Sequence, residues 1–325
     1  MAIYSQLTSE QRYQIYALLK AEHTLTFIAQ IVGKHKSTIS REIARNTGGR
    51  GYRPIQAQRL CDQRKQGKYA GRFSASDWHL VEHLLSEQQW SPEQICLRLK
   101  EDGILEISHE RIYQHIILDK QTGGDLHTYL RERIKRRKRY GSGKERRGRI
   151  LNQISIEERP VAAQARDEPG ADWEGDLIIG SKHKQAIVTL VDRCTRYTFM
   201  AKVPFKTAQL VQEAICSCLS SVKELFRSCT LDNGKEFAQH ETVSEVLQGK
   251  VYFAHPYSSW ERGTNENTNG LIRQYFPKDC DFTTITDSDI QKVQDKLNNR
   301  PRKVLNMKTP NELLFGISPN VALGY

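Results

Sequence analysis

The sequence lacks the long apolar runs of a membrane protein and the paired cysteines of a disulfide or zinc framework. No stretch approaches the roughly 18 consecutive apolar residues that span a bilayer. Residues 1–6 have neither the basic flank nor the apolar core of a secretory signal, so none is expected. The seven cysteines are odd in number and form no CxxC pair, which argues against a disulfide framework and against a zinc finger. We therefore expect reduced thiols in a cytoplasmic protein.

Charge is distributed unevenly along the 325 residues. A chain of this length is expected to form two or three domains. The net charge is +11. Residues 170–325 carry 19 lysines and arginines against 18 acidic residues, whereas residues 1–169 carry 30 against 20. A neutral half joined to a basic half favours a polyanionic partner, most simply nucleic acid. A solvated basic face is the alternative, and charge alone does not exclude it.

The N-terminal segment has the pattern of a helix-turn-helix domain. Residues 8–11 fit a capping box before a first helix, residues 26–32 fit a short second helix, and residues 33–36 fit a tight turn. Ser37 is predicted to cap a third helix over residues 38–45. Because a major groove admits one such helix, we predict that residues 1–48 bind DNA rather than forming an ordinary three-helix bundle. The expected DNA contacts are Lys36, Ser37, Thr38, Ser40, Arg41 and Arg45.

The same pattern recurs more weakly in residues 74–130, a second helix-turn-helix-like domain. Residues 91–94 again start a helix, with a serine N-cap, a proline in the first turn and a glutamine three residues after the serine. The last helix of this segment offers Arg111 as its main DNA contact. Packing between two subunits is a nearly equal interpretation of this segment.

Two basic segments are predicted to be linkers. Residues 49–73 are basic and begin with a glycine-rich stretch, which suits a chain that lies against phosphates. Residues 131–169 form the second linker, and its first part, 131–149, carries 11 lysines and arginines against two glutamates. We predict sequence-independent phosphate contacts there, with a solvated tether as the alternative. The centre of this basic segment is Lys135, Arg136, Arg137, Lys138 and Arg139.

From residue 172 the hydrophobic period changes to that of strands. The predicted strands are residues 172–180, 186–192, 197–203, 228–232 and 251–254, with helices over 207–222 and 240–247. This order is that of the ribonuclease-H-like fold. The expected fold class is therefore multidomain, with all-α helix-turn-helix N-terminal domains and an α/β ribonuclease-H-like catalytic domain over residues 170–325.

Three acidic residues are candidates for metal-dependent phosphoryl transfer. Asp176 lies on the first predicted strand, two residues after Glu174, so that both point to one face. Asp232 lies at the end of the fourth strand, before an Asn-Gly turn. Glu266 follows after 33 intervening residues, at or within a polar helix. Two Mg²⁺ ions about 3.5–4 Å apart catalyse such transfer, and Mg²⁺ prefers carboxylate oxygens.

These tracts, in this order, resemble a DDE transposase of the insertion-sequence "IS-thirty" group, within the retroviral-integrase-like superfamily. The tracts are WEGD at 173–176, TLVDRCTRY at 189–197, TLDNGKEF at 230–237, HPYSSWERGTNENTNGLIRQYFPK at 255–278, NNRPRK at 298–303 and TPNELL at 309–314. The resemblance implies an integrase catalytic domain in which Asp176, Asp232 and Glu266 are the catalytic and metal-binding residues. It further implies that Arg273, seven positions after the glutamate, lies near the DNA phosphates.

The resemblance also implies a function. A transposase of this kind binds the terminal inverted repeats of a mobile element and, with two Mg²⁺ or Mn²⁺ ions, cleaves DNA strands and transfers them. We expect double-stranded DNA at the element ends and the target as partners, self-association as a dimer or higher multimer, and a joined-ends circular intermediate. No membrane, no nucleotide cofactor and no covalent protein–DNA intermediate are expected, and the location would be the bacterial cytosol, associated with the nucleoid.

Two rival functions stay open. The first is a DNA-binding transcriptional regulator whose nuclease-like domain is inactive, although three intact carboxylates argue against it. The second is a nuclease that cuts DNA without joining it.

Residues near the three carboxylates have competing interpretations. Asp192 follows an apolar strand and is predicted to be structural, with Arg193 and Arg196 as salt-bridge partners. Glu174 is predicted to be positional rather than a helper ligand.

Glu261 competes with Glu266 as the third acidic ligand, and the spacing and surrounding asparagines favour Glu266. Trp173 and Trp260 are predicted to be buried residues that hold the flanking loops. Stacking on a flipped or frayed base is the alternative for Trp260.

Overall fold

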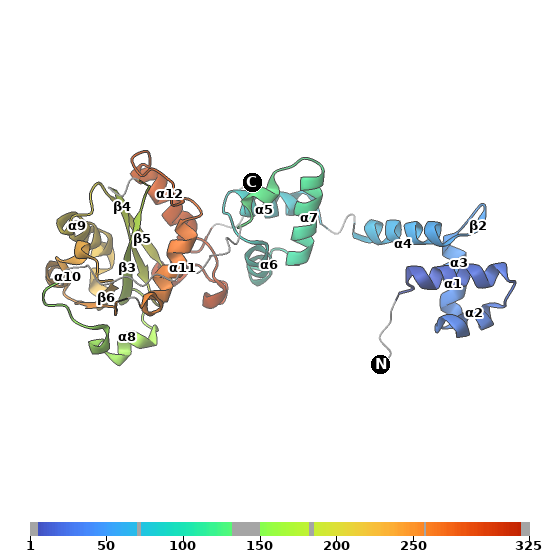
Figure 1. The fold of residues 1–325 in the computed structure, drawn as a ribbon, viewed down its shortest axis with the longest axis horizontal. Helices are drawn as coiled ribbons and strands as arrows, with labels where there is room; N and C mark the ends of the chain where they lie inside the picture. Colours follow the sequence, from blue (N-terminus) through green and yellow to red (C-terminus); the bar gives the residue numbers. More distant parts are fainter. Residues whose placement is uncertain (1–5, 70–72, 132–149, 182–184, 257, 320–325) are drawn as a thin grey trace. The chain divides into compact units, whose positions relative to one another are not determined.

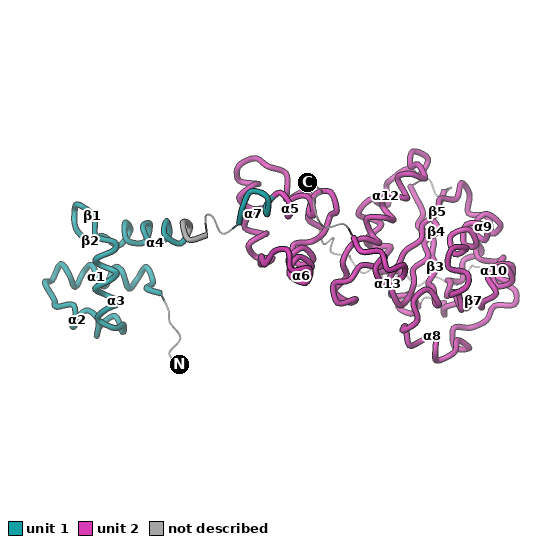
Figure 2. Tube along the Cα trace, turned by 180° about the vertical axis from the view of Figure 1, so that it is seen from behind, with its two compact units in different colours: residues 1–78 teal, residues 79–325 magenta. Residues whose placement is uncertain are grey.

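The computed structural model describes residues 6–69, 73–131, 150–181, 185–256 and 258–319, and it divides into two compact units, residues 1–78 and 79–325 (Figures 1 and 2). Within the described residues, no helix is long and apolar enough to cross a membrane. The basic cluster Lys135, Arg136, Arg137, Lys138 and Arg139 lies outside the described residues.

The first unit contains the predicted helix-turn-helix, built from α1 (Ser9–Lys20), α2 (Leu25–Val32) and α3 (Lys36–Asn46). The capping box of Thr8 and Gln11 is present at the start of α1, and Gly33 ends α2 in the left-handed conformation with φ of 68°. Ile15, Ile28 and Ile39 supply one apolar side chain from each helix to a shared core. The spacing of the apolar residues therefore predicted this domain correctly.

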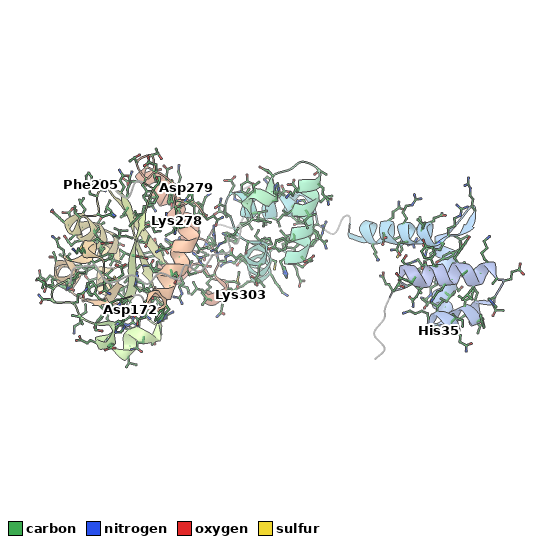
Figure 3. The ribbon with its side chains drawn as sticks, viewed as in Figure 1. His35, Asp172, Phe205, Lys278, Asp279 and Lys303 are labelled. Atoms are coloured by element: carbon green, nitrogen blue, oxygen red, sulfur yellow. The ribbon has the colours of Figure 1, made fainter. Side chains whose placement is uncertain are left out.

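Helix α3 begins earlier than the sequence analysis predicted. His35, labelled in Figure 3, is the N-cap residue, and its Nδ1 accepts a hydrogen bond from the backbone N–H of Ser37 over 3.2 Å. The prediction that Ser37 caps this helix is therefore wrong. The imidazole of His35 caps the helix in place of the Ser37 hydroxyl, because Lys36 and Ser37 already have helical geometry and form the first turn.

The predicted linker over residues 49–73 is largely structured, which corrects that expectation. Its first residues form a two-stranded hairpin, β1 (Thr47–Gly48) and β2 (Gly51–Tyr52), and helix α4 (Pro54–Tyr69) follows. The side chains of Tyr52 and Ala57 belong to the same core as the three helix-turn-helix isoleucines. The linker prediction rested on glycine and charge, but the glycines make the hairpin turn and Pro54 starts a helix, a position that proline favours.

A buried arginine joins the helices of this unit. Arg12 of α1 is 3% exposed and donates to Glu42 of α3 over 2.7 Å and to Gln58 of α4 over 2.7 Å. A buried charge needs such partners because its desolvation is costly. Arg12 is thus a structural residue of the first unit, although sequence alone would suggest a surface cation.

The second helix-turn-helix-like segment consists of α5 (Ala75–Ser86), α6 (Pro92–Glu101) and α7 (His109–Gln121), followed by the 3-10 turn η1 (Leu126–Tyr129). The predicted capping box of Ser91 and Gln94 is present, with Pro92 in the first turn. Leu84, Ile95 and Ile112 are buried and contribute one side chain from each helix. The predicted helical pattern of residues 74–130 is therefore confirmed.

Helix α6 is joined to the C-terminal segment by charged side chains. Arg98, which is 6% exposed, donates to both carboxylate oxygens of Glu312 over 2.7 Å each. Glu312 lies on α13 (Pro310–Phe315), and the exposed Lys303, labelled in Figure 3, pairs with Glu93 over 2.7 Å. These contacts join residues more than 200 positions apart, so no local pattern predicts them.

The catalytic-type domain is built on a five-stranded sheet in the order β5-β4-β3-β6-β7. The strands are β3 (Asp172–Ile179), β4 (Ala186–Asp192), β5 (Thr198–Val203), β6 (Ser228–Leu231) and β7 (Lys250–Phe253). The first three strands are antiparallel neighbours, whereas β6 is parallel to both β3 and β7. All five predicted strands are present, and the order of elements matches the predicted ribonuclease-H-like domain.

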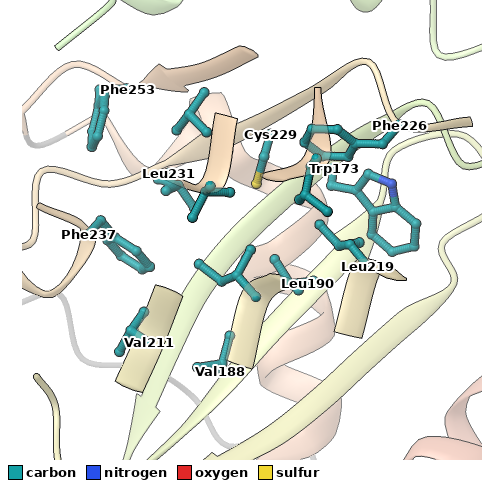
Figure 4. Packing of buried hydrophobic residues seen from close by; sticks show 14 of the residues in the cluster. Trp173, Val188, Leu190, Val211, Leu219, Phe226, Cys229, Leu231, Phe237 and Phe253 are labelled. Carbon is teal, nitrogen blue, oxygen red and sulfur yellow. The ribbon is translucent and has the colours of Figure 1, made fainter. Parts of the chain in front are cut away.

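Helices cover both faces of this sheet (Figure 1). α9 (Ala208–Leu219) and α10 (His240–Leu247) pack on one face, where Val211 and Val243 join Leu190 in a core shown in Figure 4. α11 (Gly263–Ile272) and α12 (Asp287–Asn298) pack on the other face, where Ile187 of β4 belongs to a separate core. The alternation of Ile187 and Leu190 between the two cores follows the strand period of two.

The remaining short elements are α8 (Val161–Ala165), η2 (Ile156–Glu158), η3 (Ser220–Leu225), η4 (Lys235–Phe237), η5 (Ser259–Arg262) and η6 (Lys303–Leu305).

Candidate active site

Two of the three predicted carboxylates lie side by side where the pairing of two parallel strands ends, with Asp176 inside β3 and Asp232 directly after β6. β3 and β6 pair with Glu174 opposite Thr230, so continuing the register by two residues places Asp176 beside Asp232. Asp232 directly follows β6, and its Oδ1 accepts a hydrogen bond from the N–H of Gly234 over 2.9 Å. The Asn-Gly turn thus folds back onto the carboxylate and holds it at the sheet edge, as aspartates in turns commonly do.

Close packing between the two strands depends on a glycine. A Cβ atom on Gly175 would lie 2.5 Å from Cδ2 of Leu231, whose side chain is fully buried. Each of these residues immediately precedes one of the two aspartates. The absence of a side chain at Gly175 therefore lets the strand ends approach with Asp176 and Asp232 next to each other.

An arginine spans the two aspartates. Nη1 of Arg262 lies 3.5 Å from Oδ1 of Asp176, and Nη2 lies 3.7 Å from Oδ2 of Asp232. Nη1 also donates to the carbonyl of Gly175 over 3.1 Å. Burial raises the pKa of Asp176, Arg262 lowers it, and the neighbouring Asp232 raises it again. A positive charge held between two partly buried carboxylates shows that this pair of side chains is suited to bind cations.

Helix α11 contacts the same carboxylate from the opposite side. Nδ2 of Asn269 donates to Oδ2 of Asp176 over 2.8 Å, and Oγ1 of Thr189 lies 3.1 Å from Oδ1 of Asn269. Thr189 is the cross-strand partner of Asp176 on β4. The orientation of Asp176 is therefore set jointly by the helix and by the neighbouring strand.

The third predicted carboxylate, Glu266, is exposed on the first turn of α11, three residues before Asn269. Among the residues that the structure describes, no group of three or more histidine, cysteine, aspartate or glutamate side chains is arranged to hold a metal ion. The structure thus brings Asp176 and Asp232 together and leaves Glu266 outside that pair.

Glu174 holds the first turn of α11 in place. Its carboxylate is fully buried, lies 3.2 Å from Nε of Arg193 and accepts a hydrogen bond from the backbone N–H of Asn265 over 2.9 Å. Both carboxylate oxygens are therefore engaged, which supports the positional interpretation of this residue.

Asp192 is buried, as expected of a structural residue, but its partners differ from the prediction. Its Oδ2 accepts a hydrogen bond from the N–H of Thr195 over 2.8 Å, closing the turn after β4. The predicted salt bridges to Arg193 and Arg196 are wrong, because Arg193 pairs with Glu174 and Arg196 donates to Thr264 over 2.6 Å. The backbone N–H and the hydroxyl of Thr195 both donate to Oδ2 of Asp192, so this oxygen is bound within the turn rather than by either arginine.

The competing carboxylate Glu261 is engaged by a histidine. It accepts hydrogen bonds from the backbone N–H and from Nδ1 of His255, each over 2.8 Å. Burial raises the pKa of Glu261, but these two hydrogen bonds outweigh it and lower that pKa below its usual value. Glu261 is therefore committed to a local contact rather than available to a metal.

The two tryptophans behave differently. Trp173 is fully buried, and its indole N–H donates to the carbonyl of Gly170 over 2.8 Å, so the buried role is confirmed. Trp260 is 72% exposed, which overturns the prediction that it is buried. It lies on the short turn η5.

The predicted DNA contacts on α3 largely face solvent. Lys36, Ser40, Arg41 and Arg45 are exposed, while Ser37 and Thr38 are half-buried. The guanidinium of Arg41 donates to the carbonyl of Ser37 over 3.0 Å and to its hydroxyl over 2.9 Å, on the same helix face. This face is thus available to a ligand, and its contact with DNA stays a prediction.

Two further predicted contacts lie elsewhere. Arg273 donates to the carbonyls of Ile179 over 2.9 Å and of Phe276 over 3.3 Å, and burial lowers its pKa. In this structure its guanidinium joins the end of β3 to the turn after α11, rather than extending toward solvent beside Glu266. Arg111 is half-buried in the first turn of α7. DNA contact by either residue stays a prediction.

Sequence reasoning did not single out Arg262, Asn269 or Thr189. Asn269 follows Asn265 by four residues, so the two share a helix face, and this was the signal available. Arg262 and Thr189 carried no such signal, because their roles depend on the packing of η5 and β4 beside Asp176.

Family models match both domains. A helix-turn-helix domain model matches residues 4–46, and an integrase core domain model matches residues 166–259. The transposase for insertion sequence element IS4351 of Bacteroides fragilis is 44% identical over 94% of this chain and 94% of its own length. Transposase InsI for insertion sequence element IS30A of Escherichia coli K12 is 37% identical over 95% of this chain and 83% of its own length.

Among solved structures, the catalytic core domain of BIV integrase matches with a TM-score of 0.36 and 20% identity, over 45% of this chain and 95% of that one.

An N-terminal helix-turn-helix domain joined to an integrase core of ribonuclease-H-like fold defines a DNA-binding, nuclease-like enzyme of the DDE class. The full-length relatives are more specific than the fold. The chain belongs to the IS30 family of insertion-sequence transposases, the IS-thirty group of the sequence analysis.

Proposed function

We propose that this chain binds the terminal inverted repeats of its element and catalyses metal-dependent strand cleavage and strand transfer at Asp176, Asp232 and Glu266. The observation that carries the proposal is the pair of adjacent aspartates, one inside β3 and one directly after β6, bridged by the cationic side chain of Arg262. Such an arrangement has no purpose in packing, since two partly exposed carboxylates side by side repel each other.

The donor set fits two divalent ions, Mg²⁺ or Mn²⁺. Carboxylate oxygens are the ligands these ions prefer, and the guanidinium of Arg262 shows that the pair accommodates positive charge. Asp176 and Asp232 would hold the ions, and Glu266 would complete the ligand set from α11. When bound, such ions activate the attacking oxygen and stabilise the leaving oxygen of an in-line displacement.

The protein's own residues orient the reacting groups. Asn269 fixes one oxygen of Asp176, and the N–H of Gly234 fixes one oxygen of Asp232. Glu266, which is exposed on α11, has to move toward the aspartates when DNA is bound. Arg262 balances the two negative charges beforehand and is then placed to contact a phosphate oxygen. The carboxylates position ions rather than attack phosphorus, so we expect no covalent protein–DNA intermediate.

DNA recognition is assigned to the exposed face of α3. Lys36, Ser40, Arg41 and Arg45 present hydrogen-bond donors along one helix, which suits a major groove. Two element ends have to be held together for strand transfer, so we propose that the active form is at least a dimer.

The test compares the full chain with Asp232→Asn and Glu266→Gln in a cleavage and joining assay with Mg²⁺ on labelled element ends. Glu213→Gln, an exposed change on α9 across the sheet, is the matched control. We expect both active-site variants to bind DNA like the wild type but to lose cleavage and joining by at least about 100-fold, while the control retains both activities.

Two outcomes would replace the proposal. A wild type that joins ends no better than Asp232→Asn, with DNA binding intact in both, would identify a DNA-binding regulator. Cleavage without any joined product would identify a nuclease.

A further inference from the structure

A pocket of about 270 Å³ lies against the first turns of α11, and arginines dominate its walls. Arg166 comes from the end of α8, Arg196 from the turn between β4 and β5, and Arg302 from the segment just before η6. Thr264 and Asn267 of α11 form the adjoining wall. Three cationic side chains from three separate segments therefore converge on one cavity.

Among the described residues, no carboxylate lies within 4.0 Å of the guanidinium of Arg166, Arg196 or Arg302. Arg302 donates to the carbonyl of Leu297 over 3.0 Å, while its Nε is buried without a hydrogen-bond partner. The nearby carboxylate of Glu174 forms its ion pair with Arg193. The charges of Glu174 and Asp192 act on Arg196 at longer range and offset part of its charge, but no described carboxylate forms an ion pair with any of the three arginines.

Repulsion between the positive charges also lowers the pKa of arginines in this pocket. Burial lowers the pKa of Arg302 to about 9, and the charges of Arg300, Arg131 and Arg196 lower it as well. Burial likewise lowers the pKa of Arg196, and so does the charge of Arg166. An anion in the pocket would relieve both the repulsion and the loss of hydration.

The pocket and the carboxylate site lie on different sides of one helix. Asn265 and Asn269 of α11 face β3 and β4, through their contacts with Glu174, Asp176 and Thr189. Thr264 and Asn267 line the pocket. At 100° per residue, Asn267 is rotated about 160° from both Asn265 and Asn269. An anion in the pocket would therefore lie beside the reacting phosphate and not at it.

We propose that this pocket binds a backbone phosphate of duplex DNA, separate from the phosphate at the catalytic carboxylates. Arginine suits this ligand because its planar guanidinium donates two parallel hydrogen bonds to a phosphate. The inference rests on the proposed function and deepens it, since α11 would then be held by DNA on one side while it carries Glu266 on the other. A contact of this kind positions the duplex without reading its sequence.

The experiment measures the affinity of the full chain for a duplex over a series of salt concentrations. Arg166→Gln is the leading variant, because its side chain is exposed and the change should leave folding intact; Arg196→Gln is the second. Loss of one phosphate contact should reduce the slope of log K against log salt by about 0.9. Lys223→Gln, on η3 at the α9 face of the sheet, is the charge-matched control and should leave the slope unchanged.

Other outcomes overturn the proposal. An unchanged slope in both arginine variants, or an equal change in Lys223→Gln, would exclude a specific phosphate contact. Inorganic phosphate that raises the melting temperature of the wild type but not of Arg166→Gln, with DNA binding unaffected in both, would assign the pocket to free phosphate instead. The salt dependence of DNA binding tests the phosphate site in the pocket, whereas DNA cleavage tests the catalytic role of the carboxylates. Failure of one proposal can therefore be distinguished from failure of the other.

Discussion

Asn269 and Asp176 are joined by a hydrogen bond of 2.8 Å, although 93 positions separate them in the sequence. The bond connects helix α11 to the central strand of the sheet, and it occupies one of the two oxygens of a catalytic-type carboxylate. Glu266 lies one helical turn from Asn269. The position of the helix that carries the third acidic residue is therefore coupled directly to the orientation of the first.

Replacing Asn269 should impair catalysis without impairing DNA binding. Asn269→Ala removes the donor that orients Asp176, and loss of such an outer partner typically costs about 10- to 100-fold in activity. Single-turnover cleavage measures the effect, and a mobility-shift assay checks binding. Gln291→Ala, an exposed change on α12, serves as the control. A cleavage rate for Asn269→Ala equal to that of the wild type would contradict the assigned role.

Adding one methyl group at Gly175 should destabilise the domain. The new Cβ would lie 2.5 Å from Cδ2 of the buried Leu231, and overpacking of this kind costs about 1–3 kcal/mol. Urea unfolding measures the loss, and adding Leu231→Val to Gly175→Ala should recover part of it. Gly49→Ala, whose Cβ meets nothing within 4 Å, should not destabilise the protein. A double variant no more stable than Gly175→Ala would show that the clash is not with Leu231.

The buried pair of Arg98 and Glu312 should contribute far more to stability than the exposed pair of Lys303 and Glu93. Arg98→Ala leaves the half-buried carboxylate of Glu312 with the N–H of Thr309 but without its charged partner, and loss of one member of a buried pair costs about 3–5 kcal/mol in the free energy of unfolding. Lys303→Ala removes a solvent-screened contact worth about 0–1 kcal/mol. Both pairs join α6 to the C-terminal segment, so the second variant is the matched control. Equal destabilisation by the two changes would refute this ranking.

The ring of His255 should titrate above its ordinary pKa. The hydrogen bond and charge of Glu261 raise the pKa of His255 above 6.5, and Glu157 adds a weaker contact at 3.3 Å. Because the folded-state pKa is raised, the pair stabilises the protein fully below the unfolded pKa, and this stabilisation is lost as pH rises through the folded pKa. An NMR titration of the imidazole measures the value.

Glu261→Gln should return the pKa of His255 toward about 6.5, and Glu157→Gln should lower it less. If the Glu261 variant left that pKa raised, the contact seen here would not be its cause.

Patterns within short segments were sufficient to predict much of this protein. The capping boxes at Thr8 and Ser91, the strand periods around Asp176 and the Asn-Gly turn after Asp232 all appear as expected. Each depends on side chains within a few residues of one another, so the sequence contains the whole of the interaction. The ordered acidic tracts likewise predicted the family that full-length comparison shows.

Predictions failed where a residue contacts a partner that is distant in the sequence. They also failed where a structure was inferred from amino-acid composition alone, without knowledge of the packing. The glycines after α3 suggested a linker, yet Tyr52 and Ala57 complete the core of the first unit. Trp260 was expected to be buried, but its side chain is 72% exposed.

The sequence by itself determined most of the helices and strands and the order of the elements, because local hydrogen bonding and hydrophobic period encode these features. Only the tertiary structure decided that Arg262 spans two aspartates, that Arg98 meets Glu312 and that three arginines share a pocket. These relationships depend on strand register and helix packing, which bring together charges that the linear sequence keeps far apart.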